Sequence, residues 1–279
     1  MDQTQLRSPD VYGRTFQMDE AALQAIAARL EARGQHPFFR RVIDEYMAEL
    51  APESAAAILD LGCGTGVAAR AIAQRAGLAA PITAIDISAP FIAMAQRLAA
   101  DEGVGARIDF RTGDAHGLGL PDGGFDVVLM HTLISHVADP ASVLAEAHRL
   151  LRGSGRLVVF DGDYASLTFA TDAPDAGEAT DLAVQATVVA NPRVMRRMPA
   201  LLADGGFDLL WSRGYLAADI GRADFFAPSV ASYRVLLPRA GAMSAADAAA
   251  FADRLEQASA QHRFFAASNF YSYIARRRG

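Results

Sequence analysis

Short apolar runs alternate with helical segments between residues 55 and 160 of this chain. The runs lie at residues 55–61, 81–86, 106–111, 125–130 and 156–160. Helix-like stretches follow the first, second and fourth runs, at residues 67–76, 90–100 and 140–151. Strands that are almost wholly apolar and are separated by helices are typical of a parallel sheet covered on both faces. The pattern therefore predicts an α/β fold with right-handed crossovers.

The segments on either side of this region predict further elements. Helices are expected before it at residues 18–33 and 37–50, with Gly34 ending the first of them. After it we expect helices at 177–189, 194–203, 229–237 and 245–258, and strands at 207–217 and 263–275. The stretch between the last two strands is far longer than a hairpin loop of about 2–5 residues. We therefore predict an N-terminal helical cap at 1–50, a core at 51–217 and 263–279, and a helical lid insertion at 218–262.

The composition excludes several functions. The chain has 279 residues, of which 52% are hydrophobic, and this is enough for a sizeable core. It has no lysine, which excludes a Schiff-base lysine and the lysine of a phosphate-binding P-loop. Its one cysteine, Cys63, excludes an internal disulfide and a multi-thiolate metal site. The formal net charge of −6 argues against nucleic acid or an anionic membrane as a partner.

Two further patterns are missing from the sequence. The N-terminal residues have no apolar stretch of the signal-peptide kind, and no run of about 18 apolar residues occurs, so we expect a cytoplasmic protein with no membrane partner. His131 and His136 are five residues apart, which is not the spacing of two ligands on one helix face, and we expect no metal site.

The segment Ile58–Gly66, with the sequence ILDLGCGTG, joins the first predicted strand to a helix. Glycines at positions 62, 64 and 66 let the backbone approach a ligand closely and adopt positive φ. The dinucleotide fingerprint G-x-G-x-x-G would need glycine at position 67, where Val67 stands. The next strand ends in Asp86, 20 residues after Gly66, where a carboxylate can accept hydrogen bonds from two ribose hydroxyls. The spacing predicts a nucleoside site at these strand ends.

Five segments in order resemble the class I S-adenosylmethionine-dependent methyltransferases, and more narrowly the small-molecule branch that contains the ubiquinone and menaquinone enzymes. They are ILDLGCGTG, ITAIDIS (82–88), RTGDAHGLGLP (111–121), FDVVLMHTLISHVADP (125–140) and LLRGSGRLVVF (150–160). The resemblance covers roughly residues 55–160. It implies a Rossmann-like, doubly wound sheet of seven strands, mostly parallel with an antiparallel last strand, and the 263–275 segment fits that last strand.

The resemblance also implies a role for each matching residue. Asp60 and Gly62 would lie by the methionine part of the cofactor, with Gly64 and Gly66 shaping the turn. Asp86 would hold the ribose hydroxyls and Ile87 would pack on the adenine. Asp114 would take the adenine amino group, although Gly113-Asp114 would also make a plain turn, and the backbone of Ala115 would reach a ring nitrogen. His131 would face the cofactor and the acceptor.

On the acceptor side the residues leave alternatives open. His131 is the candidate catalytic base, because a histidine titrates near neutral pH. The candidate acceptor contacts are Tyr12, Phe16, His136, Asp163, Tyr164 and Tyr233. Each has a structural alternative: His136 bracing a turn, Asp163 and Tyr164 in a solvated loop, and the other aromatic residues in ordinary packing.

The function expected from the resemblance is methyl transfer from S-adenosylmethionine to an O, N or C atom of a small molecule, by a monomer or homodimer. Three alternatives remain. One is a protein that binds S-adenosylmethionine without methyltransferase activity, and another is a nicotinamide-dependent oxidoreductase, against which Val67 and the Asp114 segment count. The third is a nucleic-acid or protein methyltransferase, for which the net charge of −6 counts against a nucleic-acid acceptor. The sequence does not identify the acceptor or the atom methylated.

Overall fold

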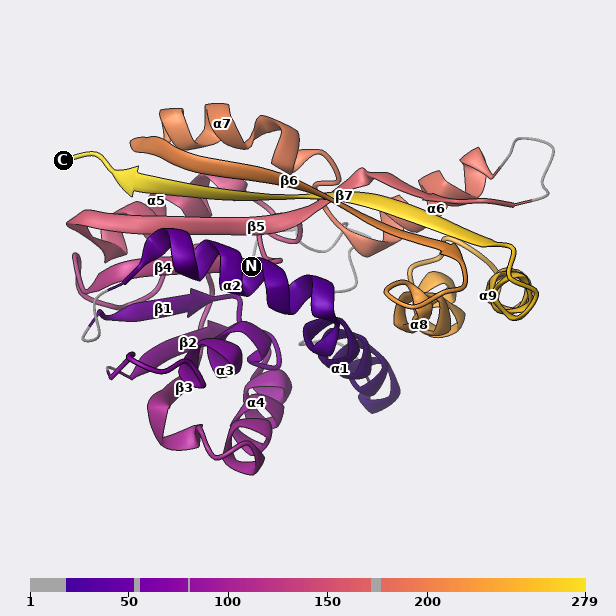
Figure 1. Ribbon diagram of the computed structural model, residues 1–279, viewed down its shortest axis with the longest axis horizontal. Coiled ribbons are helices and arrows are strands. Elements are labelled where there is room, and N and C mark those ends of the chain that lie inside the picture. The colour runs from indigo at the N-terminus through magenta and orange to yellow at the C-terminus, as the bar shows by residue number, and fades with distance from the viewer. Residues whose placement is uncertain (1–18, 53–55, 80, 172–176) are drawn as a thin grey trace.

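The computed structural model describes residues 19–52, 56–79, 81–171 and 177–279. Tyr12 and Phe16, two of the expected acceptor contacts, lie outside these residues. The strands are β1 (Ile58–Leu61), β2 (Ile82–Asp86), β3 (Ile108–Thr112), β4 (Phe125–His131), β5 (Leu151–Phe169), β6 (Phe207–Gly221) and β7 (Phe264–Arg277). Within the described ranges these seven strands form one sheet in the spatial order β3-β2-β1-β4-β5-β7-β6 (Figure 1).

The sheet is parallel over five strands and antiparallel at its other edge. β1 pairs in parallel with both β2 and β4, β2 with β3, and β4 with β5. β7 lies between β5 and β6 and is antiparallel to both. This arrangement confirms the predicted sheet of seven strands with an antiparallel last strand. The strand order reverses between β1 and β4, and ligands of open α/β sheets bind outside the carboxyl ends of the strands at such a point.

Helices cover both faces of the sheet. They are α1 (Glu20–Gln35), α2 (Pro37–Leu50), α3 (Val67–Ala73), α4 (Ala89–Asp101), α5 (Pro140–Leu150), α6 (Glu178–Val188), α7 (Val194–Asp204), α8 (Ala227–Arg239) and α9 (Ala245–Ala260). Alternate residues of β4 enter different cores, because side chains of a strand point alternately to its two faces. Val127 and Leu129 join the cluster of α2 and α3, whereas Val128 and Met130 join that of α5 and α7.

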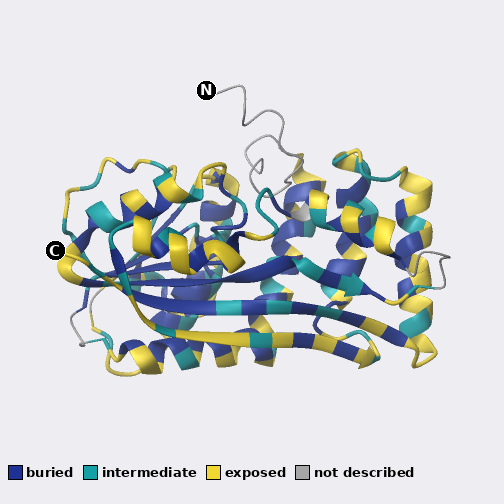
Figure 2. Ribbon diagram, turned by 90° about the horizontal axis from the view of Figure 1, so that it is seen from above, coloured by how far each residue is buried: buried dark blue, intermediate teal, exposed yellow. Residues whose placement is uncertain are grey.

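Strands β5, β6 and β7 continue past the ends of the parallel strands and carry α6, α8 and α9 (Figure 1). Along the last part of β6, buried Ala217 and Asp219 alternate with exposed residues (Figure 2). The buried side of this extension packs on α8 and α9 through Phe264 and Ala266 of β7. The extended sheet therefore places the two helices of the predicted insertion beside the parallel core.

Two strands are longer than their apolar runs predicted. β5 was expected at 156–160 and runs to Phe169, and β6 was expected to end at 217 and runs to Gly221. Pairing with β7 carries both strands beyond those runs, so that Asp163 pairs with Asn269 and Gly221 with Phe264. Apolar runs report burial, whereas strand length here is set by hydrogen bonding to a long partner. The first four residues of the predicted insertion, 218–221, belong to the sheet.

The first helix does not end at Gly34 as predicted. α1 runs to Gln35, and Gly34 lies inside it. A Cβ atom added at Gly34 would lie 2.3 Å from a methyl carbon of Val67, the first residue of α3. Gly34 therefore allows two helices to pack closely rather than stopping one of them. Among the helices that the structure describes, none is both long and apolar enough to cross a membrane.

Candidate active site

The glycine-rich bend lies between β1 and α3 and is fixed to the neighbouring strand. Gly62, Gly64 and Gly66 have φ values of 74°, 55° and 80°, a region that residues with a side chain rarely adopt. The N–H groups of Gly62 and Cys63 donate to the carbonyl oxygen of Ile85, at 2.7 and 2.9 Å. The bend is therefore held at the carboxyl ends of β1 and β2, with no side chain on three of its residues.

Asp86 is the last residue of β2, and its carboxylate faces this bend. Oδ2 accepts a hydrogen bond from the N–H of Gly64 at 2.8 Å, and Oδ1 accepts one from the N–H of Ser88 at 2.8 Å. Burial raises the pKa of Asp86, while these two N–H groups and the charge of His136 oppose the rise. Each carboxylate oxygen retains a further lone pair for a hydroxyl group of a ligand.

Asp60 lies on β1 and is almost completely buried, with 1% of its surface exposed. Oδ2 accepts a hydrogen bond from the N–H of Ala69 at 3.1 Å, but Oδ1 has no hydrogen-bond partner among the described residues. Burial raises the pKa of Asp60 to about 7; the Ala69 N–H lowers it and the charge of Asp86 raises it further. A buried carboxyl with one unused oxygen fits a positively charged group such as an ammonium.

The third acidic residue, Asp114, follows β3. Its Oδ1 accepts a hydrogen bond from the N–H of His116 at 2.9 Å and lies 2.7 Å from Nδ1 of the same residue. Burial is the largest single influence and would raise the pKa of Asp114, but the hydrogen bonds and charge of His116 lower it overall. Ile87, after β2, is exposed, and Ala115 packs partly buried beside Leu118. These residues line the outer end of the same strand tips.

His131 ends β4 and is buried among aromatic rings, with 7% of its surface exposed. Its ring centre lies 4.8 Å from that of Phe160 and 5.3 Å from that of Phe39. Nδ1 lies 3.2 Å from the hydroxyl of Tyr46. Burial, and then the charge of Arg33, lower the pKa of His131 to about 3. In this setting the imidazole is neutral and a weak base.

The part of the chain that matches known proteins contains these strand-end residues. Residues 59–159 match the family described as Methyltransferase domain. A demethylmenaquinone methyltransferase of Lactiplantibacillus plantarum is 32% identical over 128 residues, which are 46% of this chain and 53% of that protein. A ubiquinone biosynthesis O-methyltransferase of Pseudomonas aeruginosa is 37% identical over 102 residues, 36% of this chain and 41% of that protein. This chain therefore resembles the methyltransferase family over residues 59–159. It spans only about half, or less, of the length of these relatives.

Solved structures share the fold over more of the chain. A putative methyltransferase from Bacillus halodurans superposes with a TM-score of 0.60 at 17% identity, covering 85% of this chain and 99% of that one. The cyclase SpnF superposes with a TM-score of 0.59 at 21% identity, covering 86% and 81%. Because one neighbour is named a cyclase, the shared fold alone does not assign methyl transfer.

Helix α1 contacts the glycine-rich bend directly. Glu31 accepts a hydrogen bond from the hydroxyl of Thr65 at 2.6 Å and pairs with both oxygens to buried Arg70 at 2.6 and 2.7 Å. A methyl group of Leu30 would lie 3.3 Å from a Cβ added at Gly64. Sequence reasoning missed this link, because 34 residues separate Glu31 from Thr65. The only local signal was a polar Thr65 inside an otherwise apolar turn.

The four candidate acceptor residues that the structure describes are not gathered in one place. Asp163 lies within β5 and not in a loop, is 2% exposed and is paired with Nε of Arg196 at 2.8 Å. Tyr164 is buried, with its ring centre 6.2 Å from that of His136. Tyr233 lies on α8 and stacks on Phe251 of α9 at 6.1 Å. His136 and Tyr164 are thus neighbours, whereas Tyr233 belongs to the helical pair on the sheet extension.

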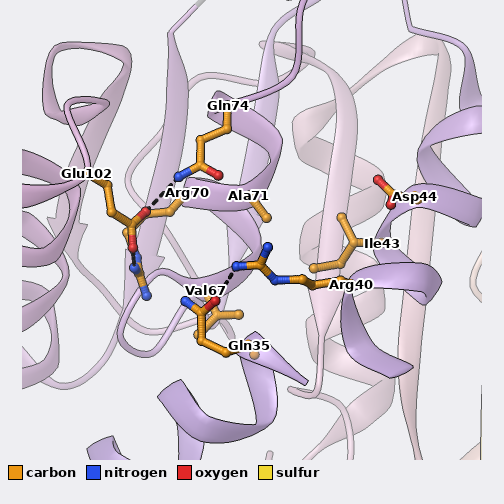
Figure 3. A pocket seen from close by; sticks show the side chains of 10 residues that line it. Gln35, Arg40, Ile43, Asp44, Val67, Arg70, Ala71, Gln74 and Glu102 are labelled. Carbon is orange, nitrogen blue, oxygen red and sulfur yellow. Dashed lines mark hydrogen bonds and ion pairs between the residues drawn. The ribbon is translucent and has the colours of Figure 1, made fainter. Parts of the chain in front are cut away.

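A separate hollow of about 390 Å³ lies on the outer side of α3 (Figure 3). Arg40, Gln74 and Glu102 are among its polar lining groups. Its arginines are already engaged, because Arg40 bonds to Gln35 and Arg70 pairs with Glu31 and Glu102. Asp60, Asp86 and Asp114 are not among the residues that line this hollow, which is therefore distinct from the strand tips. No group of three or more residues suited to a metal ion occurs in the described ranges.

Proposed function

We propose that this protein binds S-adenosylmethionine across the tips of β1, β2 and β3 and transfers its methyl group to a small molecule. The observation that carries the proposal is the joint geometry of the bend and its acids. A backbone bend with three left-handed glycines donates a hydrogen bond to Asp86 through the N–H of Gly64. Next to it Asp60 holds an unpaired carboxyl oxygen. Together these supply hydrogen-bond acceptors and negative charge where the ribose of an adenosine and an ammonium need them.

Each acidic residue then has one task. Asp86 would accept hydrogen bonds from the two ribose hydroxyls, and Asp60 would pair with the ammonium of the methionine end. Asp114 would accept from the adenine amino group, since it is exposed beside the same strand tips. Ile87 would cover one face of the adenine and the backbone of Ala115 would reach a ring nitrogen. Leu133 must turn aside, because its side chain now lies against Gly62.

The sulfonium of the cofactor supplies an activated methyl group. The residues of this chain would align the acceptor with it and keep water away. α1 is placed for the second task, because it lies on the glycine-rich bend through Glu31 and Leu30 and on α8 through Leu23 and Leu236. We propose that α1 and the helices of the 218–262 segment close over the bound molecules.

The net charge of −6 and the quinone-type names of the relatives favour a small molecule, rather than a nucleic acid, as acceptor. We retain His136 and Tyr164 as acceptor contacts, because their rings adjoin each other close to β4. Asp163 would have to release Arg196 before it could bind a ligand. The oligomeric state, a monomer or a homodimer, is a further proposal that sedimentation would test.

Calorimetry with S-adenosylhomocysteine tests the binding part of the proposal. We expect Asp86→Ala to weaken binding at least about tenfold, because two charge-assisted hydrogen bonds of about 1.5–3 kcal/mol each are lost. Gly64→Val should also weaken it, because valine is strained at a φ of 55°. Asp109→Ala is the control, since this exposed acid of β3 pairs with Arg111. Unchanged affinity in both test variants would refute the site.

Turnover needs a separate assay. The wild-type protein is incubated with S-adenosylmethionine labelled in its methyl group and a panel of phenols, carboxylic acids, amines and acidic carbon compounds. Release of S-adenosylhomocysteine that depends on one acceptor class would support transfer. Tight binding of the cofactor without release from any acceptor would instead support the binding-only alternative.

A further inference from the structure

The ring of His131 has one nitrogen with a partner and one without. Nδ1 lies 3.2 Å from the hydroxyl of Tyr46, whereas Nε2 is buried and has no hydrogen-bond partner among the described residues. A buried polar group without a partner costs about 1–3 kcal/mol. Such groups in native proteins call for an explanation, and one explanation is a ligand that supplies the missing partner.

The contact with Tyr46 determines which nitrogen carries the proton. Tyr46 is fully buried, and within the described ranges its hydroxyl has one hydrogen-bond partner, His131. Burial, and then the charge of Asp60, raise the pKa of Tyr46 well above its usual value of 10, so the phenol keeps its proton. That proton needs an acceptor, and the only one in reach is the Nδ1 lone pair. Because the neutral imidazole has a single proton, it lies on Nε2.

Arg33 lies near this donor and has no counter-ion in the part of the chain that the structure describes. It is on the buried face of α1 with 6% of its surface exposed, and no carboxylate of the described residues contacts it. Its guanidinium carbon lies 4.7 Å from the centre of the Phe39 ring, which in turn contacts the ring of His131. A buried cation with no ion-pair partner among the described residues is costly, unless an anion is present in the working state.

We propose that Arg33 and the Nε2–H group of His131 together bind an anionic oxygen of the methyl acceptor. Both groups donate hydrogen bonds and neither accepts one, which is the pattern that recognises a carboxylate or a comparable anionic group. Phe39 lies against both groups and Phe160 against His131, and the two rings favour an apolar or aromatic body behind that anion. The inference rests on the proposed function and names its substrate class: a small organic acid.

The placement favours the acceptor over the cofactor as the source of the anion. The methionine end of the cofactor is assigned to Asp60 and the glycine-rich bend, which belong to β1. Arg33 and His131 come from α1 and from the end of β4, beside the aromatic cluster. His131 then donates a hydrogen bond that orients the methyl acceptor, and it does not remove a proton from that molecule. The charge of Arg33 acts on His131, and Asp60, Arg75, Tyr215 and Asp44 act on Tyr46.

Nitrogen-15 NMR of histidine-labelled protein tests the proton position without a substrate. We expect the wild-type spectrum to show His131 protonated at Nε2 and not at Nδ1, without change between pH 5 and pH 8. In Tyr46→Phe the donor to Nδ1 is lost, and a population protonated at Nδ1 should appear. A wild-type ring that carries its proton on Nδ1, or that titrates between these pH values, would overturn the donor assignment.

Binding of benzoate and of neutral benzamide, each with saturating S-adenosylhomocysteine, tests the substrate class. We expect the wild-type protein to bind benzoate at least about tenfold more tightly, and Arg33→Met to abolish that preference without changing benzamide affinity. Arg33→Lys, which keeps the cation, should retain part of the preference. Arg41→Met is the matched control, because Arg41 also lies over a phenylalanine ring, that of Phe38, but its side chain is 60% exposed.

Three results would count against the proposal. Equal affinity for benzoate and benzamide, or a benzoate preference that survives Arg33→Met, would overturn it while leaving cofactor binding intact. If Arg33→Met weakens S-adenosylhomocysteine but not 5′-methylthioadenosine, which lacks the amino-acid end, the anion is the carboxylate of the cofactor. A wild-type protein that binds no S-adenosylhomocysteine would instead refute the proposed function itself.

Discussion

At the scale of single residues, the site combines buried groups that lack partners with backbone held in uncommon conformations. Asp60 and His131 each bury a polar atom without a partner among the described residues, on neighbouring strands β1 and β4. Thr132, directly after His131, has a φ of 59°, which is uncommon for a β-branched residue. Its N–H donates to the carbonyl of Phe160 at 2.7 Å. Such strain persists where the surroundings enforce it, as at functional sites.

Asp60 gives a prediction about pH. Its pKa of about 7 in the folded protein exceeds the value of 3.8 expected when unfolded, so folding favours the protonated form. Its contribution to the free energy of unfolding is therefore fully present below about pH 4 and lost as the pH rises through 7. Asp60→Asn cannot ionise. Its stability relative to the wild type should rise by about 1–3 kcal/mol between pH 5 and pH 8.

Urea denaturation of both proteins at the two pH values measures this difference, with Asp109→Asn as an exposed control. The same variant should bind S-adenosylhomocysteine about tenfold more weakly at pH 8, because the ammonium loses an ionised partner. A difference in stability that does not change with pH would show that Asp60 is already ionised in the folded protein.

At the scale of elements, helix packing on the glycine-rich bend depends on a small residue. Gly34→Ala would place a methyl group within 2.3 Å of Val67, and moving the helices apart should cost about 1–3 kcal/mol of stability. Val67→Ala in the same chain should restore much of the loss, because it removes both methyl groups that the new Cβ would meet. Thermal unfolding of the two variants measures this.

Gly117→Ala is the control for that pair, because a Cβ at Gly117 meets nothing within 4 Å. If Gly34→Ala is as stable as the wild type, or if Val67→Ala gives no rescue, the close contact between α1 and α3 is not as described.

Most elements of the parallel core could be predicted from the sequence, because their signals are local. Pro37 and Pro140 lie at helix starts, and Ser88 and Asp139 cap helices. Each of these residues lies within a few positions of the helix boundary that it marks. The lengths of β5 and β6 could not be predicted, because the residues they pair with on β7 are up to 120 positions away. Gly34 was misread for the same reason: its partner Val67 lies on another helix.

The features of the site also divide into those that the sequence could predict and those that it could not. The spacing of glycines and acids predicted a nucleoside site, and the structure holds Asp86 2.8 Å from the Gly64 backbone. The contacts of Glu31 with Thr65 and of Tyr46 with His131 could not be predicted, since each joins elements that meet only in the folded chain. The low pKa of His131 also comes from burial that no local pattern reports.

At the scale of the whole molecule, α1 connects the cofactor end of the sheet to the helical extension. It contacts α3 and α4 of the core, and it also packs on α8, with Asp19 bonded to Arg239 at 2.6 Å. A molecule bound under α1 would therefore affect both the core and the helical extension. Closure over a ligand needs an element that touches both, and α1 does so.

Hydrogen exchange tests this connection. With S-adenosylhomocysteine at about 100 times its dissociation constant, the folded state should gain about 2.7 kcal/mol. We expect protection to increase in the bend at 62–66, in α1 and in α8, whereas the far sheet edge at 207–211 should change little beyond the global gain. Protection confined to the bend would show that α8 does not respond and would count against a lid.

The structure of the protein with S-adenosylhomocysteine bound is the most direct test of the nucleoside site. We predict the ribose hydroxyls at the carboxylate of Asp86, the amino-acid end beside Asp60 and the glycine-rich bend, and the side chain of Leu133 moved away from Gly62. The nucleoside found in the hollow beside Arg40 and Gln74, or at the strand tips without contact to Asp86, would contradict the account.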